Sequence, residues 1–300
     1  MRYFKISLYL AAILLFLEFN ALAQDDLLEL LEEETSMEEE IDYTYATFKT
    51  TRIINGQSIE TTSGGVLNFI IAHRFGKISD GAYEFFGLDQ STIRLGLEYG
   101  ITDNFNIGIG RSSFLKTVDG YVKYKFLKQS TGKKNVPLTI VFYSNMAIDG
   151  TKWSEPEREN YFSSRMSFAS QLLIARKFSN AFSLQLTPGF VHRNLVETTE
   201  DQNDILAIGF GGRYKLSNRV SVNAEYFYQL PGTNADKTSN SVSLGFDIET
   251  GGHIFQLHMT NSKGMIEQYF IPNTTGKITD GDIYFGFNIN RVFTISKKNR

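Results

Sequence analysis

Cysteine is absent from all 300 residues of the chain. Its absence excludes disulfide bonds, thiolate metal sites, cysteine catalysis and a lipid anchor on an N-terminal cysteine. Long apolar runs are also lacking after the N-terminus, since no later segment approaches the 18 or so uncharged apolar residues of a membrane-spanning helix. Such a chain must be stabilised by the packing of a core or by a membrane that its strands cross.

The N-terminal sequence has the three parts of a secretory signal. The basic start MRYFK is followed by the apolar run ISLYLAAILLFLEF and by ALA before Gln24, which fits the small-x-small rule for cleavage. We expect residues 1–23 to be a signal peptide and the mature chain to leave the cytoplasm. The classes that remain are a periplasmic or secreted β protein and an outer-membrane barrel.

The net charge of −3 conceals an acidic leader before a mildly basic body. Residues 24–42 hold ten acidic residues and no basic one, whereas residues 43–300 have an excess of bases. We expect residues 24–42 to form an acidic periplasmic extension, most simply a solvated tail. The alternatives are a docking segment for a periplasmic protein partner and a plug attracted to a basic lumen.

Twelve segments from Val66 onward have the two-residue alternation or the composition of β-strands. They span residues 66–75, 91–101, 105–113, 119–128, 137–148, 162–178, 181–193, 204–216, 219–230, 241–250, 253–262 and 282–295. Short connections such as 102–104 largely alternate with long ones such as 149–161, which is typical of bacterial outer-membrane barrels. The predicted fold is all-β: a single up-and-down antiparallel transmembrane β-barrel of about 12 strands within residues 66–300.

The two phases of this alternation differ in composition. One phase is apolar, whereas the other repeats glycine among polar and charged residues, which fits the crowded inner wall of a barrel better than a solvent-facing sheet. The predicted lumen-lining residues are Arg94, Glu98, Lys123, Lys125, Arg165, Arg213, Glu225, Asp247 and His258. Their excess of bases would bias an open pore toward anions. Pairing of the same charges would instead keep a filled lumen closed, and the sequence favours neither alternative.

Residues 43–65 precede the first predicted wall strand. A thirteenth strand here would give an odd number, which is unusual in single-chain bacterial barrels. We therefore expect an extended segment that lies in or under the lumen, with Lys49 and Arg52 against acidic residues of the wall.

The segments TFKTTRIINGQSIET, GGVLNFIIAHRFG and FFGLDQSTIRLGLEYGITDNFNIGIGRSSFLKTVDGYVKYKFLKQ resemble the DUF5777 family of β-barrel proteins of Bacteroidetes. The similarity runs from about Thr47 to the C-terminus and is most specific between His73 and Gln129. The resemblance implies a barrel in the outer membrane of a Gram-negative bacterium, in contact with its lipid. It implies no catalytic residue and no ligand.

Catalytic and metal-binding motifs are lacking. The four histidines, His73, His192, His253 and His258, show no metal-ligand spacing, and residues 149–151 and 279–282 hold only fragments of a calcium loop. We expect no cofactor, no metal and no nucleic-acid partner.

The leading functional expectation is a non-enzymatic channel or transport wall for small polar solutes. A non-conducting scaffold that holds a periplasmic partner is the alternative. A membrane-embedded hydrolase that uses His192 with Ser170 or Ser183 is a distant third, because the spacing of these residues gives it no support.

Overall fold

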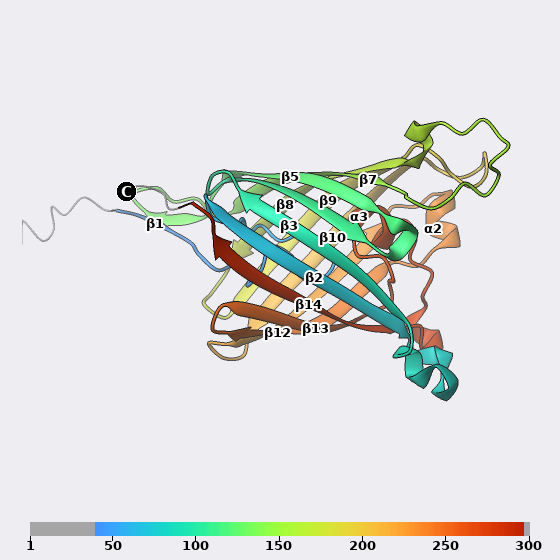
Figure 1. The fold of residues 1–300 in the computed structure, drawn as a ribbon. Coiled ribbons are helices and arrows are strands. Elements are labelled where there is room, and N and C mark those ends of the chain that lie inside the picture. The colour runs from blue at the N-terminus through green and yellow to red at the C-terminus, as the bar shows by residue number, and fades with distance from the viewer. Residues whose placement is uncertain (1–39, 297–300) are drawn as a thin grey trace, which may run out of the picture. The chain divides into compact units, whose positions relative to one another are not determined.

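The computed structural model describes residues 40–296 and contains a closed barrel of twelve antiparallel strands (Figure 1). The wall strands are β2 (Val66–Lys77), β3 (Ser91–Gly100), β4 (Phe105–Ser112), β5 (Val118–Leu127), β7 (Thr139–Ile148), β8 (Met166–Lys177), β9 (Phe182–Arg193), β10 (Asp204–Lys215), β11 (Val220–Gln229), β12 (Ser241–Thr250), β13 (His253–Thr260) and β14 (Tyr284–Thr294). Each pairs with the next along the chain, and β14 closes onto β2. The predicted fold class is confirmed. The predicted signal peptide and most of the acidic extension lie outside the described residues.

The remaining elements are short. Strand β1 (Ile41–Tyr43) pairs with β6 (Ser130–Gly132) in a separate two-stranded sheet. The helical elements are η1 (Ile78–Asp80), η2 (Ala82–Gly87), η3 (Phe114–Lys116), η4 (Phe162–Arg165), α2 (Thr233–Lys237), α3 (Glu267–Phe270) and η5 (Ile278–Asp280). Within residues 40–296, no helix has the length and apolar character needed to cross a membrane.

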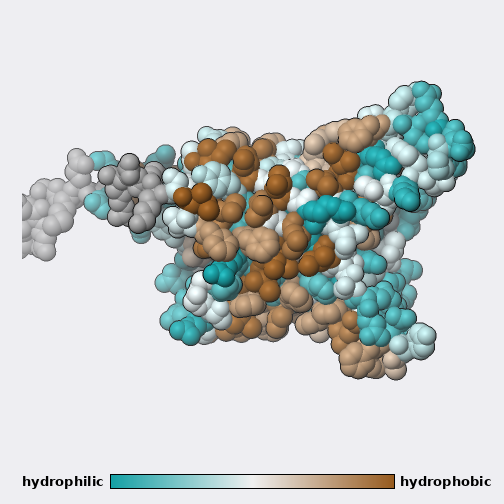
Figure 2. All heavy atoms as spheres, viewed as in Figure 1, coloured by the Kyte–Doolittle hydropathy of each residue, from teal (hydrophilic) through white to brown (hydrophobic). Residues whose placement is uncertain are grey.

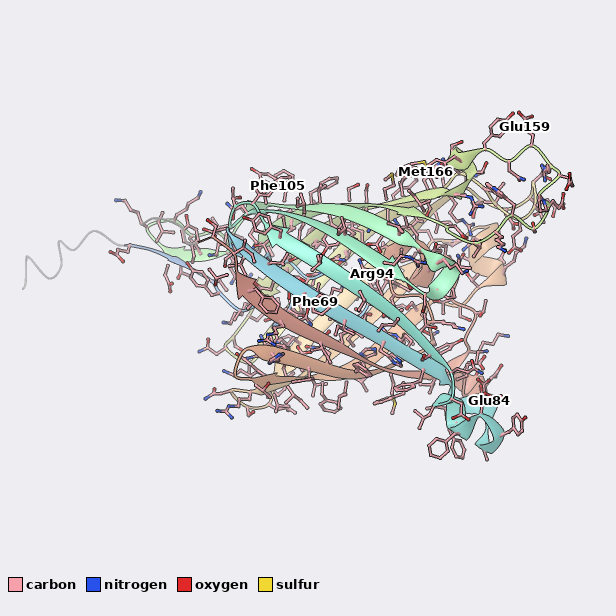
Figure 3. The ribbon with its side chains drawn as sticks, viewed as in Figure 1. Phe69, Glu84, Arg94, Phe105, Glu159 and Met166 are labelled. Atoms are coloured by element: carbon pink, nitrogen blue, oxygen red, sulfur yellow. The ribbon has the colours of Figure 1, made fainter. Side chains whose placement is uncertain are left out.

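The connections divide the barrel into two unlike ends. We call the end with the turns at residues 101–104, 178–181, 216–219 and 251–252 the short-turn end. The opposite end, the long-loop end, carries residues 78–90, 149–165, 194–203, 230–240 and 261–283. Figure 3 shows Glu84 and Glu159 in two of these long loops, whereas Phe105 lies at the opposite end of the barrel.

The outer face of the wall is apolar through the middle of the strands. Leucine, isoleucine and phenylalanine side chains such as Leu95, Ile109 and Phe210 are exposed there, and Figure 2 shows the hydrophobic side chains gathered over the strands of the visible face. On the strands of the described chain, charged residues that face outward lie within three residues of a strand end; they are Lys77, Arg111, Arg176, Asp204 and Arg291. This distribution fits a lipid-facing surface, because a charge is costly at mid-depth and tolerated near the headgroups.

We predict that Leu95→Arg, in the middle of β3, will lower the free energy of unfolding by about 2–4 kcal/mol, because the new charge would lie near the bilayer midplane. Tyr99→Arg, on the same face but at the strand end, should cost about 0–1 kcal/mol. Urea unfolding of both variants in lipid vesicles, followed by the fluorescence of Trp153, measures the two effects. Equal losses would contradict a membrane-facing surface.

Candidate functional site in the barrel lumen

Within residues 40–296, two segments that are not wall strands occupy the lumen. The first, which we call the N-terminal insert, comprises residues 47–62 and is almost entirely buried. It turns at Ile53–Gly56, where the Ile53 N–H donates to the Gly56 carbonyl at 2.8 Å. Both of its ends lie at the short-turn end, where the Lys49 ammonium donates to the Asn218 carbonyl and Thr61 donates to the Asp103 carbonyl. The N-terminal insert therefore enters the barrel and returns on the same side.

The second segment, the loop insert, comprises residues 261–276 and connects β13 to β14 from the long-loop end. Most of it is buried, including the whole of α3. The two inserts meet inside the barrel, since Arg52 donates to the Met265 carbonyl at 3.2 Å and Gln57 to the Glu267 carboxylate at 3.4 Å. Each insert thus fills the lumen from one end.

Apolar side chains pack each insert against a different part of the wall. The N-terminal insert contributes Phe48, Ile53 and Ile59 to a cluster with inward side chains of β5, β7 and β8. The loop insert contributes Phe270 and Ile271 to a cluster with side chains of β8, β9, β10 and β11. These contacts favour the inserted state, because each fully buried side chain of this kind stabilises it by about 1.5–3 kcal/mol.

Lys123, one of the predicted lumen residues, binds the backbone of the N-terminal insert. Its ammonium donates to the carbonyls of Thr51, Ser58 and Glu60 at 2.9, 3.2 and 3.2 Å, and the side chain is fully buried. An ammonium has three N–H donors, and here each has a carbonyl acceptor. Lys123 therefore holds both arms of the insert together.

Arg213 and Gln256 bind the same backbone at two other places. Arg213 donates to the carbonyls of Ala46 and Thr47 at 2.9 and 3.1 Å, where the insert begins. Gln256 donates to the Ile53 carbonyl at 2.7 Å, close to the tip. Both wall side chains satisfy carbonyls that no strand pairs with.

Glu225 holds the tip through its amide groups. Its carboxylate accepts the backbone N–H groups of Ile54, Asn55 and Gly56 at 3.2, 2.7 and 3.0 Å. Hydrogen bonds to an ionised acceptor are stronger than those between neutral groups. The tip is therefore fixed by one wall carboxylate on its donor side and by Gln256 on its acceptor side.

Other interior charges pair with each other or with hydroxyl groups. Arg94 forms a two-point interaction with Asp119, at 2.9 Å for Nε to Oδ1 and 2.5 Å for Nη2 to Oδ2 (Arg94 is labelled in Figure 3). Glu98 accepts the Tyr121 hydroxyl at 2.8 Å and also the hydroxyl of Thr62. Within residues 40–296, five bases and five acids are buried: Arg52, Arg74, Arg94, Lys123 and Arg213, and Glu98, Asp119, Glu225, Asp247 and Glu267. The interior is balanced in charge.

The other predicted lumen residues differ in their surroundings. Asp247 is buried and accepts from Gln256 at 2.8 Å, and Lys125 is half-buried near the short-turn end. His258 is buried, and neither of its ring nitrogens has a partner among the described residues.

The prediction for Arg165 is wrong. Strand β8 begins at Met166 rather than at residue 162, and Arg165 lies in η4, before the wall. Its guanidinium donates to the carbonyls of Asp149 and Thr151 and stacks on Trp153 at 3.9 Å. It orders a long loop instead of lining the lumen.

Lys49 and Arg52, both expected to contact acidic residues of the wall, have different kinds of partner. Lys49 pairs with Glu249 of β12. The expectation for Arg52 is not met, since its hydrogen bonds go to the carbonyls of Asn55 and Met265. Arg52 lies where the two inserts meet, so backbone carbonyls are its nearest acceptors.

Three interior charges were missed by the sequence reasoning. Arg74 is inward on β2, and the alternation of that strand contained the signal. Asp119 shares the phase of Lys123, so the alternation contained that signal too. Glu267 belongs to a loop, and no periodicity in the sequence could place it in the lumen.

Glycines on the inner face leave space for particular bulky side chains. A side chain at Gly211 would collide with the Cδ1 atom of Ile53 of the N-terminal insert, whereas one at Gly209 would meet the ring of Phe227, a side chain of the wall itself, at 2.5 Å. The predicted crowding of the inner wall is therefore local, since each of these glycines faces one particular bulky neighbour.

No cluster of three or more metal-ligating side chains occurs within residues 40–296. On the outer face, His192 Nδ1 lies 2.5 Å from Asp204 Oδ1. The hydroxyl of Ser170 bonds to that of Ser144 at 3.0 Å, and Ser183 is buried on the inner face. In the described structure neither serine is hydrogen-bonded to His192, so this histidine activates neither of them.

We predict that Glu225→Ala will release the tip of the N-terminal insert, because three buried N–H groups would lose their acceptor at about 1–3 kcal/mol each. Amide hydrogen exchange of residues 50–58 should become at least about tenfold faster than in the unmodified chain. Asp119→Ala is the matched control, since this buried acid pairs with Arg94 of the wall and not with the N-terminal insert. Unchanged exchange in Glu225→Ala would show that the carboxylate does not hold the tip.

Solved structures similar to this chain are outer-membrane barrels. The NanC porin covers 77% of this chain and 100% of its own, with 6% identity and a TM-score of 0.45. The KdgM porin covers 76% and 99%, with 9% identity and a TM-score of 0.44. The outer membrane protein Omp33 of Acinetobacter baumannii covers 79% and 100%, with 8% identity and a TM-score of 0.41. At these identities the likeness concerns the fold alone.

The sequence matches no curated protein. Residues 48–293 match the family DUF5777, described as a membrane bound beta barrel domain. The matched range includes nearly all of the N-terminal insert, the loop insert and the wall, so the match covers nearly the whole described barrel. The chain therefore belongs to the DUF5777 family of membrane-bound β-barrel domains.

Proposed function

We propose that this chain is an outer-membrane channel for small polar solutes whose passage is closed by the two inserts. The observation that carries the proposal is that the inserts are held by wall side chains, through Lys123, Arg213, Glu225 and Gln256, whereas the wall is closed by its own backbone ladder from β2 to β14. An insert can leave without opening the wall. Removal would uncover a polar inner surface that water can enter.

The energetics favour the closed state without making it permanent. Hydrogen bonds between insert and wall contribute about 0.5–1.5 kcal/mol each, because water replaces them when the lumen fills. The buried apolar side chains Phe48, Ile53 and Ile59 add to the cost of withdrawing the N-terminal insert. A trigger that binds the withdrawn state is therefore required for a substantial open population.

The charge balance of the interior bears on selectivity. The predicted excess of bases came from the wall positions singled out in the sequence. In the structure Asp119 and Glu267 join the buried acids, whereas Arg52 and Arg74 take the places of Arg165 and Lys125 among the buried bases. An opened lumen would present both signs of charge. We infer that the opened lumen would pass small polar solutes without a strong preference for anions.

The second candidate function is a non-conducting scaffold. The observation in its favour is the mutual contact of the inserts through Arg52 and Met265 and through Gln57 and Glu267, which closes the lumen from both ends. In this case the barrel would anchor the N-terminal region at the membrane, and residues 24–42 would bind a periplasmic protein.

Conductance in planar bilayers separates the two candidates. We expect little current from the full-length chain, and little after removal of residues 24–62 alone or after replacement of residues 263–273 by a short Gly-Ser linker, because the other insert still fills its half. The variant with both changes should conduct steadily. A folded double variant without current, its fold checked by resistance to SDS unfolding at room temperature, would exclude the channel.

A single substitution tests how the N-terminal insert is held in the lumen. Gly211→Leu should displace Ile53 and speed amide exchange in the N-terminal insert, since the new side chain would occupy the position of its Cδ1 atom. Gly212→Leu, on the outer face of the same strand, is the matched control and should leave exchange unchanged. Equal exchange in the two variants would mean that the insert does not depend on the space at Gly211.

A further inference from the structure

A groove of about 770 Å³ crosses the outer face of the wall over strands β8 to β12. We call it the outer groove. Its volume is within the range of about 300–1,000 Å³ that is usual for small-molecule sites. We propose that the outer groove holds one acyl chain of an anionic phospholipid whose phosphate binds Arg176.

The outer groove exists because two small residues are neighbours on the outer face. Gly212 of β10 pairs directly with Ala224 of β11. This row of paired residues continues to Leu184 on one side and to Leu244 on the other. The adjacent row toward the long-loop end is bulky throughout and also lines the groove; it consists of Ile174, Leu186, Phe210, Tyr226 and Val242. The small residues therefore leave a depression beside a ridge of large apolar side chains.

The outer groove runs from the level of the headgroups toward the middle of the membrane. The row of small residues begins at Arg176, which pairs with Leu184 and is followed in β8 by Lys177 alone. Gly212 lies farther from the short-turn end of its strand, and Ala224 lies in the middle of β11. Strands of such barrels tilt by about 35–45°, so a row of paired residues changes depth from strand to strand. An acyl chain that enters beside Arg176 would therefore descend along the groove into the apolar layer.

Arg176 supplies an unpaired positive charge at the shallow end of the groove. Its side chain is exposed, lines the groove and lies 5.2 Å from the centre of the Phe178 ring. Within residues 40–296 its guanidinium has neither a hydrogen bond nor an ion pair. A guanidinium matches the geometry of a phosphate, with which it forms paired charge-assisted hydrogen bonds. The phosphate of a lipid headgroup would complete these bonds at this depth.

The charges at this end of the barrel favour an anionic headgroup. Lys177 and Lys215 end strands β8 and β10 on the same side. Among the described residues that line the groove, the one acid is Glu225, whose carboxylate lies in the lumen and accepts the Asn55 N–H. Basic residues near a membrane surface attract anionic lipids, whereas a zwitterionic headgroup would bring its own cation beside these bases. Short turns of outer-membrane barrels face the periplasm, so the lipid would belong to the periplasmic leaflet.

Native mass spectrometry of the full-length chain in detergent counts the lipids that each barrel retains. The two probes are a phosphatidylglycerol and a phosphatidylcholine with identical acyl chains. We expect one phosphatidylglycerol to be retained at least about fivefold more strongly than phosphatidylcholine. Equal retention of the two lipids, retention of neither, or a second copy of the chain in place of lipid would each overturn the proposal.

The first pair of variants tests the phosphate contact. Arg176→Gln should weaken the retention of phosphatidylglycerol at least about tenfold, because the charge-assisted hydrogen bonds would be lost. Arg291→Gln is the matched control, since Arg291 also faces outward near the short-turn end, 4.9 Å from the Phe293 ring, but does not line the groove. Equal losses in the two variants would mean that any outward charge at this end holds the lipid, which would overturn the site.

The second pair of variants tests the acyl chain. Gly212→Phe should lower the retention of phosphatidylglycerol to the level of phosphatidylcholine, because the ring would fill the floor of the groove. Gly120→Phe, on the outer face of β5, is the matched control and should leave retention unchanged. Full retention in a folded Gly212→Phe would show that the groove holds no acyl chain. Should Gly212→Phe fail to fold, the exposed Arg176→Gln still decides the proposal.

Discussion

The interior of this barrel depends on one requirement: the backbone of a chain that is buried without strand partners must still be hydrogen-bonded. The wall cannot meet this need with its own backbone, because its N–H and C=O groups pair along the ladder from strand to strand. Side chains of the wall therefore form these hydrogen bonds with the insert. Lys123 supplies three donors to carbonyls, and Glu225 accepts three amide N–H groups at the tip. The polar inner face serves in place of water around the N-terminal insert.

This requirement also changes the role of the charged side chains in the lumen. In a water-filled pore, charges set the preference for ions. Here the buried bases and acids are balanced, and several bind backbone or pair with each other, as in Arg94 with Asp119. The inward glycines fit the same picture, because Gly211 leaves the space that Ile53 occupies.

Much of the wall could be predicted from the sequence, because a period of two fixes which face each residue occupies once the strand is identified. The inward positions of Arg94, Lys123 and Glu225 follow from that rule, and Arg74 and Asp119 could have been found with it. The rule fails where the backbone leaves the strand. Arg165 stands just before β8, and Glu267 lies in a loop whose path depends on contacts with Tyr143 and Gln57 far away in sequence. The partners of each interior charge depend on such distant contacts, so composition alone left the open and filled lumens undecided.

The way in which the two inserts are attached to the wall has a further consequence. The loop insert is joined to β13 and β14 at the long-loop end, whereas the N-terminal insert joins β2 at the short-turn end and turns back within the barrel. In the proposed channel, each insert would therefore withdraw toward the end of the barrel at which it is attached. Unblocking the whole length would require two movements in opposite directions, so an event on one side of the membrane alone would leave one insert in the lumen.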